Sequence, residues 1–185
     1  MIIRAFLPSD IIKVQQFADR EIGVGYYTKS ELIENQKKSV GKNNEISSFL
    51  LIDEKTDQVK GLRLAFPPGN WDHGKGRAQR SDLWPHSLKE TAYFQSLFLS
   101  PDVQKQGWGP KLSQMSIDLF RKNKVKGIAT HSWKQSPHNS SVRYLEKIGF
   151  KKIIEHPLYW FDVDYECTLD GKPCRCTAVE MYKTL

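Results

Sequence analysis

The segment from Leu97 to Leu112, LFLSPDVQKQGWGPKL, has the residue types and spacing of an anion-binding turn. Its apolar start predicts a strand, Gln104–Gly109 a turn, and Pro110 the first turn of a helix. A helix N-terminus leaves about four backbone N–H groups unpaired and carries roughly half a positive charge. Gly107 and Gly109 lack a Cβ, so a phosphate can approach the backbone closely. The segment predicts a diphosphate site, although the same glycines also suit an ordinary strand-to-helix turn.

The elements that would position this turn alternate between strand-like and helix-like segments along 185 residues. This alternation predicts a mixed α/β domain built on one sheet. Short apolar runs predict strands at 2–6, 49–53, 59–66, 92–99, 127–133, 150–154 and 177–182. Apolar periodicity or a capping signal predicts helices at 11–17, 28–38, 110–123 and 139–148. We expect a single domain over 1–185, ending in a closing segment at 155–185.

A second segment, NSSVRYLEKIGF from Asn139 to Phe150, combines with this turn into a pair of motifs. The sequence Gln104-Lys105-Gln106-Gly107-Trp108-Gly109 fits the Q/R-x-x-G-x-G/A motif of the GNAT N-acetyltransferases, and the second segment resembles that family's next motif. The order and spacing of the elements match as well, up to about Ile154. The resemblance implies a twisted, mostly antiparallel sheet of six to seven strands, with about four helices on its two faces.

The resemblance also implies an acetyl-CoA site between two diverging strands. Backbone groups of Leu97–Leu99 would contact the pantetheine arm, while the strand 127–131 diverges to leave a wedge. N–H groups of residues 106–109 would hold the diphosphate, with Pro110 supplying none. Asn139 would reach the cofactor, or would serve as a plain helix N-cap. The implied cofactor-binding residues are Leu97, Phe98, Leu99, Gln104, Lys105, Gln106, Gly107, Trp108, Gly109 and Asn139.

Acyl transfer to an amine needs an acid for the departing thiolate and a base for the amine. The family often places a tyrosine four residues before the glycine that ends the second helix, but here that position is Leu145. Tyr144, one residue earlier, is the candidate acid, or a packed aromatic. The family's frequent glutamate before the first motif is also missing, since that strand carries Tyr93 and Gln95. The remaining candidate bases are Asp82, Glu90, His73, His86 and His131, and we assign none of them.

Residues 67–90 form a long polar connection between two expected strands. Such connections are usually functional or disordered, and Trp71 and Trp84 argue against disorder. We interpret the stretch as an insertion loop that forms a lid or a wall of the acceptor site, with the two indoles as a contact surface. A surface insertion or a dimer contact is the alternative, and a homodimer stays open.

Three cysteines, Cys167, Cys174 and Cys176, lie near the C-terminus. With His156 they could supply four zinc ligands, but zinc sites usually show Cys-x-x-Cys spacing. We therefore expect reduced, half-buried structural thiols and no metal, with zinc binding and redox or substrate contact as alternatives.

The net charge of +7 indicates either a basic surface or an anionic partner. The basic residues are scattered, so the pattern does not favour nucleic acid. No apolar run is long enough for a membrane helix, and the apolar start is too short before Pro8 for a signal peptide. We expect a cytoplasmic enzyme that transfers the acetyl group of acetyl-CoA to an amine of unknown identity. The alternative is a non-catalytic acyl-CoA-binding sensor or interaction module.

Overall fold

A seven-stranded sheet forms the centre of the computed structural model, which describes residues 1–185. Its strands are β1 (Ile2–Ala5), β2 (Phe49–Asp53), β3 (Gln58–Phe66), β4 (Thr91–Leu99), β5 (Gly127–Trp133), β6 (Lys151–His156) and β7 (Ala178–Thr184). They lie in the order β1-β2-β3-β4-β5-β7-β6. Every neighbouring pair is antiparallel except β4 and β5, which are parallel. The expected mostly antiparallel sheet is confirmed.

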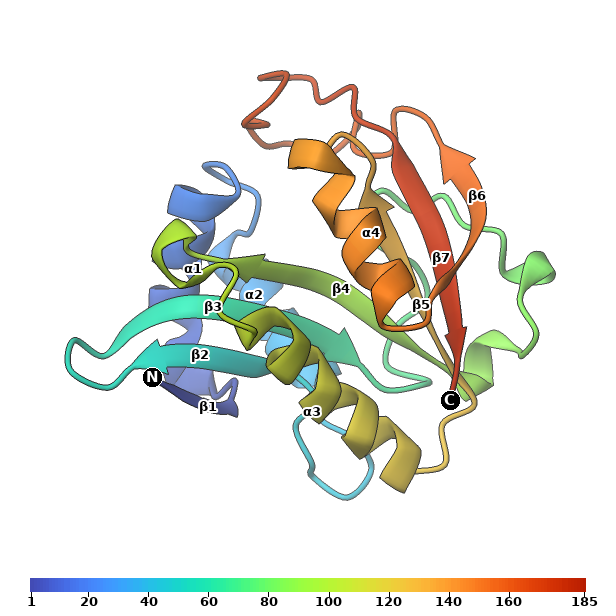
Figure 1. Cartoon of the computed structure of the whole chain (residues 1–185), viewed down its shortest axis with the longest axis horizontal. Helices are drawn as coiled ribbons and strands as arrows, with labels where there is room; N and C mark the ends of the chain where they lie inside the picture. Colours follow the sequence, from blue (N-terminus) through green and yellow to red (C-terminus); the bar gives the residue numbers. More distant parts are fainter.

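Four helices cover the two faces of this sheet: α1 (Ile11–Glu21), α2 (Lys29–Lys38), α3 (Trp108–Lys122) and α4 (Ser140–Lys147). Figure 1 shows α1 and α2 behind the sheet and α3 and α4 in front of it. The main core lies on the α1–α2 face, and a second cluster fills the space under α3 and α4. No helix has the length and apolar character needed to cross a lipid bilayer.

Local signals in the sequence fix two of the helix ends. The Thr28 side chain accepts a hydrogen bond from the Glu31 N–H at 3.2 Å, and Glu31 accepts one from the Thr28 N–H at 2.9 Å. This reciprocal capping box satisfies two N–H groups at the start of α2. Gly149, with φ +92°, ends α4 in the left-handed conformation that favours glycine. Both ends were expected from the sequence.

The connection between β3 and β4 differs from its expected role. Trp71 and Trp84 are 6% and 8% exposed and belong to the main core. The Trp71 indole donates to the Thr91 carbonyl at 2.9 Å, and the Trp84 indole donates to the Glu180 carboxylate at 2.5 Å. The prediction that the two indoles serve as a contact surface is therefore wrong, because both are buried. Residues 67–90 pack onto the sheet, and their tryptophans are part of its core.

Candidate functional site

The strands β4 and β5 separate in the middle of the sheet. Their parallel pairing runs from Thr91–Gly127 to Phe94–Thr130 and stops there. Beyond this point β4 stays paired with β3, and β5 stays paired with β7. One edge of each strand is thus freed, and the sheet opens into a fork. The divergence expected from the sequence is present, and it begins at residue 131 of β5.

A β-bulge lies at the base of this fork. Ala65 pairs with Phe94 and Leu64 pairs with Ser96, so Gln95 is the extra residue in β4. A bulge bends its strand and re-aims the residues that follow, and bulges are frequent next to active sites. The sequence contained no signal for it. Here the bulge turns β4 away from β5 at the point where their pairing ends.

The turn before α3 presents unpaired backbone donors at the open end of β4. Gly107 has φ +82° and stands at the N-cap of α3. The backbone N–H groups of residues 105–109 have no intramolecular acceptor. A Cβ on Gly107 would meet nothing within 4 Å, whereas one on Gly109 would lie 3.5 Å from Leu97 and Leu99 side chains. The first turn of α3 therefore packs against the freed end of β4, and its N–H groups are left without hydrogen-bond acceptors.

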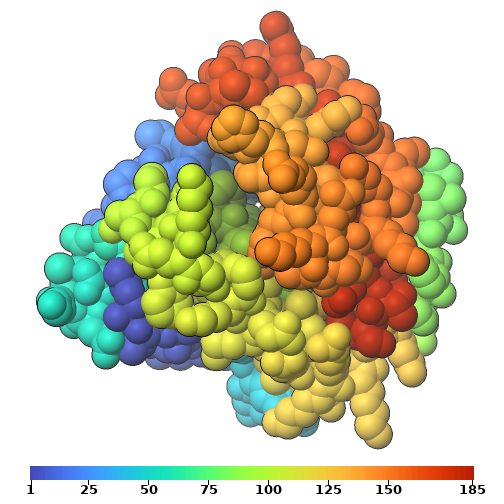
Figure 2. Space-filling view, viewed as in Figure 1, coloured from blue at the N-terminus to red at the C-terminus, as the bar shows by residue number.

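Two glutamine side chains brace this turn. The Gln104 side-chain amide donates to the Leu99 carbonyl at 3.0 Å, and the Gln106 amide donates to the Asp102 carbonyl at 2.8 Å. Their side chains are thus engaged within the loop, which leaves backbone N–H groups as the donors for an anion. Figure 2 shows the surface hollowed between this yellow-green segment and the orange α4.

Asn139 stands on the other side of the fork, at the N-cap of α4. Its side chain makes no capping hydrogen bond, because Ser136 Oγ accepts from the Ser141 N–H instead, at 3.0 Å. The Asn139 Oδ1 atom is buried and has no hydrogen-bond partner. The reading of Asn139 as a plain N-cap is therefore wrong for its side chain. A buried, unpaired acceptor suits an external N–H or O–H donor.

Side chains of α4 contact both β5 and α3. Ser141 Oγ and Ser132 Oγ of β5 lie 2.7 Å apart. The Tyr144 hydroxyl donates to Ser113 Oγ at 2.7 Å and lies 3.2 Å from the Gly109 carbonyl, both in α3. Tyr144 thus connects α4 to α3 across the front of the fork. Leu145, where the family often has its tyrosine, is a 5% exposed core residue.

A buried cation lies behind Tyr144. The Arg63 guanidinium donates to Ser113 Oγ at 3.1 and 2.8 Å and stacks 4.2 Å above the Phe94 ring. It is 2% exposed and makes no ion pair with a carboxylate. Burial lowers the pKa of Arg63 to about 10, which leaves it charged at neutral pH. Arg63, Ser113 and Tyr144 form a polar network that the sequence analysis did not identify.

A cavity of about 70 Å³ lies at the open end of the fork, beside residues of the α1–α2 face. Phe98 of β4 and Trp133 of β5 both line it, so it lies between the two freed arms. Glu21 is its one acidic lining residue and accepts from Ser100 Oγ at 3.0 Å and from Arg20 Nε at 2.8 Å. Its other lining residues are Ile22, Tyr26, Trp160, Tyr165, Cys167 and Thr168. The sequence analysis missed Glu21, because it lies at the end of a helix among polar residues and no local motif distinguishes it from a surface glutamate.

The candidate bases from the sequence are engaged elsewhere. Asp82 pairs with Arg80, and Glu90 accepts from Ser87 Oγ at 2.7 Å, both in exposed turns. His73 bonds the adjacent Gly74 carbonyl, and His86 contacts the Tyr182 hydroxyl. None of these residues lines the cavity.

The fifth candidate, His131, is buried on the α1–α2 face. It contacts the Tyr93 hydroxyl at 2.8 Å, and its ring stacks on Tyr159 at 4.5 Å between centroids. Burial lowers the pKa of His131, which favours the neutral imidazole. Like the other four, it is not a lining residue of the cavity. These contacts describe a structural histidine within a polar network.

Comparisons with protein-family models and with curated protein sequences find no match. Solved structures do match over nearly the whole chain. Arabidopsis thaliana NAA60 in complex with acetyl-CoA has a TM-score of 0.72 at 13% identity, covering 100% of this chain and 98% of its own. Chaetomium thermophilum Naa20 with a bisubstrate analogue has a TM-score of 0.69 at 13% identity, covering 100% and 87%.

The ribosomal-protein-S18-alanine N-acetyltransferase of Escherichia coli has a TM-score of 0.68 at 15% identity, covering 99% of this chain and 92% of its own. An acetyltransferase of the GNAT family from Streptococcus pneumoniae has a TM-score of 0.67 at 13% identity, covering 100% and 99%. At such identities the likeness is one of overall fold. The chain has the fold of the GNAT N-acetyltransferases.

Proposed function

We propose that this protein transfers the acetyl group of acetyl-CoA to a primary amine by direct attack of the amine on the thioester. The observation that carries the proposal is the fork between β4 and β5. Unpaired N–H groups lie before α3 on one side of it, and a cavity with a carboxylate lies at its open end. A thioester in the fork would thus lie between an anion-binding turn and an amine-binding cavity.

The donor would bind along the freed edge of β4. The backbone of Leu97–Leu99 would bond the pantetheine arm, and Asn139 Oδ1 would accept from one of its amides or hydroxyls. The N–H groups of residues 105–109 would hold the diphosphate, aided by the positive end of α3. The net charge of +7 favours a ligand that carries several negative charges.

The acceptor would enter the cavity beside Glu21. A protonated amine would be attracted by this carboxylate, and most of the other lining residues are aromatic or apolar. The amine must lose a proton before it attacks, which costs about 3–5 kcal/mol for a pKa near 10.4. We assign that proton to Glu21, directly or through water.

The amine nitrogen forms a bond to the acetyl carbon, the carbon–sulfur bond breaks, and the electron pair stays on sulfur. The Tyr144 hydroxyl, half-buried between α4 and α3, supplies a proton to that thiolate and is reprotonated from solvent. Ser113 Oγ links Tyr144 to the buried Arg63 guanidinium, because it accepts hydrogen bonds from both.

The test is thiol release from acetyl-CoA by the purified protein in the presence of amines of several classes. The panel contains peptides with a free N-terminus, peptides with an internal lysine, polyamines and aminoglycosides. We expect thiol release that saturates with one class and a product heavier by one acetyl group in mass spectrometry. Calorimetry with CoA that detects no binding would refute the proposal at its first step.

A second candidate function is a domain that binds acyl-CoA without turnover. The core position of Leu145 favours it, because the family's usual acid is absent there. This reading predicts micromolar or tighter binding of acetyl-CoA with no thiol release above the uncatalysed rate for any amine. The first function predicts both binding and release, so the same two measurements separate them.

A further inference from the structure

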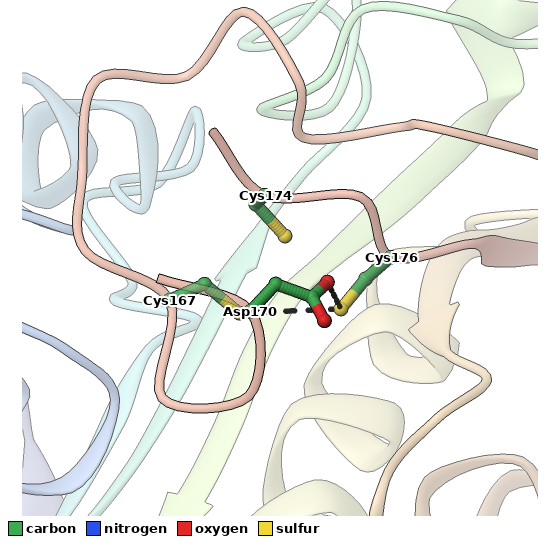
Figure 3. A group of neighbouring side chains, drawn as sticks. All are labelled: Cys167, Asp170, Cys174 and Cys176. Atoms are coloured by element: carbon green, nitrogen blue, oxygen red, sulfur yellow. Dashed lines mark hydrogen bonds between the residues drawn. The ribbon is translucent and has the colours of Figure 1, made fainter. Parts of the chain in front are cut away.

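Four potential metal ligands meet in the segment between β6 and β7. The side chains of Cys167, Asp170, Cys174 and Cys176 point toward one another from a single loop (Figure 3). Their sulfur and oxygen atoms all lie within 4.8 Å of one another. The three thiols are free, and all three cysteines are buried. The sequence analysis considered the cysteines with His156, but the structure brings Asp170 to them instead.

The distances in this cluster fit tetrahedral zinc. With Zn–S bonds of about 2.3 Å, two thiolates on one ion lie about 3.8 Å apart. The sulfurs of Cys167 and Cys176 are 3.9 Å apart. A Zn–O bond of about 2.0 Å places a carboxylate oxygen about 3.5 Å from a bound sulfur. Asp170 Oδ2 lies 3.3 Å from the Cys176 sulfur.

The backbone is shaped to bring these ligands together. Cys167 and Gly171 exchange two backbone hydrogen bonds of 2.9 Å each, which closes a tight hairpin around Asp170. Gly171, with φ +71°, permits the turn. The spacing Cys-x-x-Asp-Gly is that of a Cys-x-x-Cys zinc turn with aspartate in the second position. The Cys-x-x-Cys spacing rule, which left zinc only as an alternative in the sequence analysis, did not take this carboxylate into account.

Two N–H groups next to the cluster are placed to stabilise negatively charged metal ligands. The Arg175 N–H donates to Asp170 Oδ2 at 3.1 Å. The indole N–H of Trp133 is buried without a hydrogen-bond partner and lies beside Cys176. Such outer N–H groups orient and stabilise metal-bound carboxylates and thiolates. Asp170 itself has no ion pair with a lysine, arginine or histidine among the salt bridges of the chain.

The other cluster of potential ligands, His131, His156 and Glu180, has a different geometry. His156 Nε2 lies 2.6 Å from Glu180 Oε2, which is a hydrogen-bond distance. Two ligands bound at about 2.0 Å to one tetrahedral ion would lie about 3.3 Å apart. Glu180 also accepts from the Trp84 indole and the Arg80 N–H. His131 Nε2 lies 3.5 Å from the same Glu180 oxygen and has no hydrogen-bond partner. The direct hydrogen bond between His156 and Glu180 is nevertheless too short for two ligands on one ion, which favours the cysteine cluster as the metal site.

We propose that Cys167, Asp170, Cys174 and Cys176 bind one structural Zn²⁺ ion. The ion closes the loop that forms one wall of the cavity, since Cys167, Tyr165 and Trp160 line it. The same loop packs on the α1–α2 connection, where Tyr165 and Tyr26 meet edge to face at 4.9 Å. With four protein ligands the site has no open position for substrate, so the ion holds structure and does not take part in catalysis.

Elemental analysis of the protein purified without chelators tests this inference directly. We expect about one zinc per chain and three thiols that become reactive only when a chelator or denaturant removes the metal. Cobalt substitution is expected to give thiolate-to-cobalt charge-transfer bands and the intense visible bands of tetrahedral coordination. Metal-free protein with three thiols reactive in the native state would overturn the inference. So would a disulfide that leaves one free thiol.

Two substitutions at Asp170 give opposite expected results. Asp170→Asn is expected to weaken zinc binding at least about 100-fold in competition with a chromogenic chelator. Asp170→Cys completes a four-thiolate site, so it is expected to retain zinc. In its cobalt form the thiolate-to-cobalt absorption is expected to rise to about four thirds of the wild-type value, because four thiolates replace three. Asp164→Asn is the matched control, because Asp164 lies in the same loop and pairs only with Lys172. An Asp170→Asn protein that keeps full zinc affinity would contradict the assigned ligand.

Hydrogen exchange gives a readout that does not depend on enzymatic activity. Zinc removal is expected to raise exchange in residues 157–177 and to leave residues 97–109 unchanged, because only the first segment is closed by the ion. Equal exchange with and without zinc would show that the ion does not hold this wall. The zinc measurements and the acetyl-transfer assay can therefore fail independently.

Discussion

The Thr130 hydroxyl donates a 2.8 Å hydrogen bond to the Phe94 carbonyl at the last paired position of β4 and β5. One residue further along β4 comes the bulge at Gln95, and one residue further along β5 the strand has lost its β4 partner. This side-chain bond thus closes the parallel ladder where the fork begins. Its position sets how deep the fork reaches into the sheet.

Replacing Thr130 with valine is expected to destabilise the base of the fork. The substitution keeps the side-chain shape but removes the donor to a buried carbonyl, which costs about 1–3 kcal/mol of unfolding free energy. We expect CoA affinity to fall several-fold as well, because the arms of the fork are no longer fixed. Chemical denaturation and calorimetry measure the two effects. Thr91→Val is the control, since Thr91 is buried at the start of β4 and its hydroxyl donates to the Ser87 carbonyl, away from the fork.

Gly107→Ala is expected to weaken CoA binding about tenfold, an effect of about 1.4 kcal/mol. The added methyl group projects from the turn that presents the N–H groups, where phosphate would approach. Gly69→Ala is a closely matched control. Gly69 has φ +85° against +82° for Gly107, and a Cβ at either position meets nothing within 4 Å. Both variants should lose a similar 1–2 kcal/mol or so of stability from backbone strain. If Gly107→Ala and Gly69→Ala bound CoA equally well, the turn at Gly107 would not be the diphosphate site.

Tyr144→Phe is expected to lower kcat about 100-fold while CoA affinity changes less than about threefold, as for loss of a general acid. Ser113→Ala serves as the comparison, because it removes the α3 partner of Tyr144 but keeps the phenol. We expect its effect on kcat to be much smaller. If both variants reduce kcat equally, Tyr144 acts by connecting the helices and not by donating a proton.

Glu21→Gln is expected to reduce kcat/KM for the amine at least about tenfold, because a charged hydrogen bond to the acceptor contributes about 1.5–3 kcal/mol. CoA affinity should stay unchanged, since Glu21 lines the cavity and not the turn before α3. Glu146→Gln, on the exposed face of α4 where it pairs with Lys152, provides the control. If Glu21→Gln lowered the affinity for CoA and left kcat/KM for the amine unchanged, the cavity beside Glu21 would not be the acceptor site.

The sequence predicted the fold well wherever the signal was local. The capping box of Thr28 and Glu31, the left-handed Gly149 and the strand Gly127–Trp133 all appear where they were expected. Each depends on residues within one turn or on a short apolar run, so no tertiary contact was needed to recognise it. The turn before α3 belongs to the same class, since two glycines and a strand-to-helix transition define it.

Features that depend on distant partners could not be read from the sequence. Trp71 and Trp84 looked like a surface loop because their neighbours are polar, yet their indoles bond Thr91 and Glu180 across the chain. Glu21 lines the cavity only because β4 and β5 diverge next to it, so that Phe98 and Trp133 line the same cavity. The convergence of Asp170 with three cysteines likewise follows from a hairpin closed by backbone bonds.

Acid is expected to destabilise the protein in two steps that involve His131 and Glu180. Burial lowers the pKa of His131 below its usual value near 6.5, despite the nearby carboxylate of Glu180. The unfolded chain then takes up a proton that the folded protein does not, so unfolding free energy declines as the pH falls below about 6.5. Burial alone would raise the pKa of Glu180, but the nearby His131 ring and hydrogen bonds from His156 and Trp84 hold it at about 2.

The Glu180 contribution is therefore complete above about pH 4.5 and disappears as the pH falls toward 2, a loss of about 3 kcal/mol. Urea unfolding at a series of pH values measures both steps. In His131→Asn the decline between about pH 6.5 and 5 should flatten, since asparagine does not titrate. The difference between the two curves cancels groups common to both proteins, acid release of a bound metal included. Parallel curves over this range would show that His131 is already protonated in the folded protein.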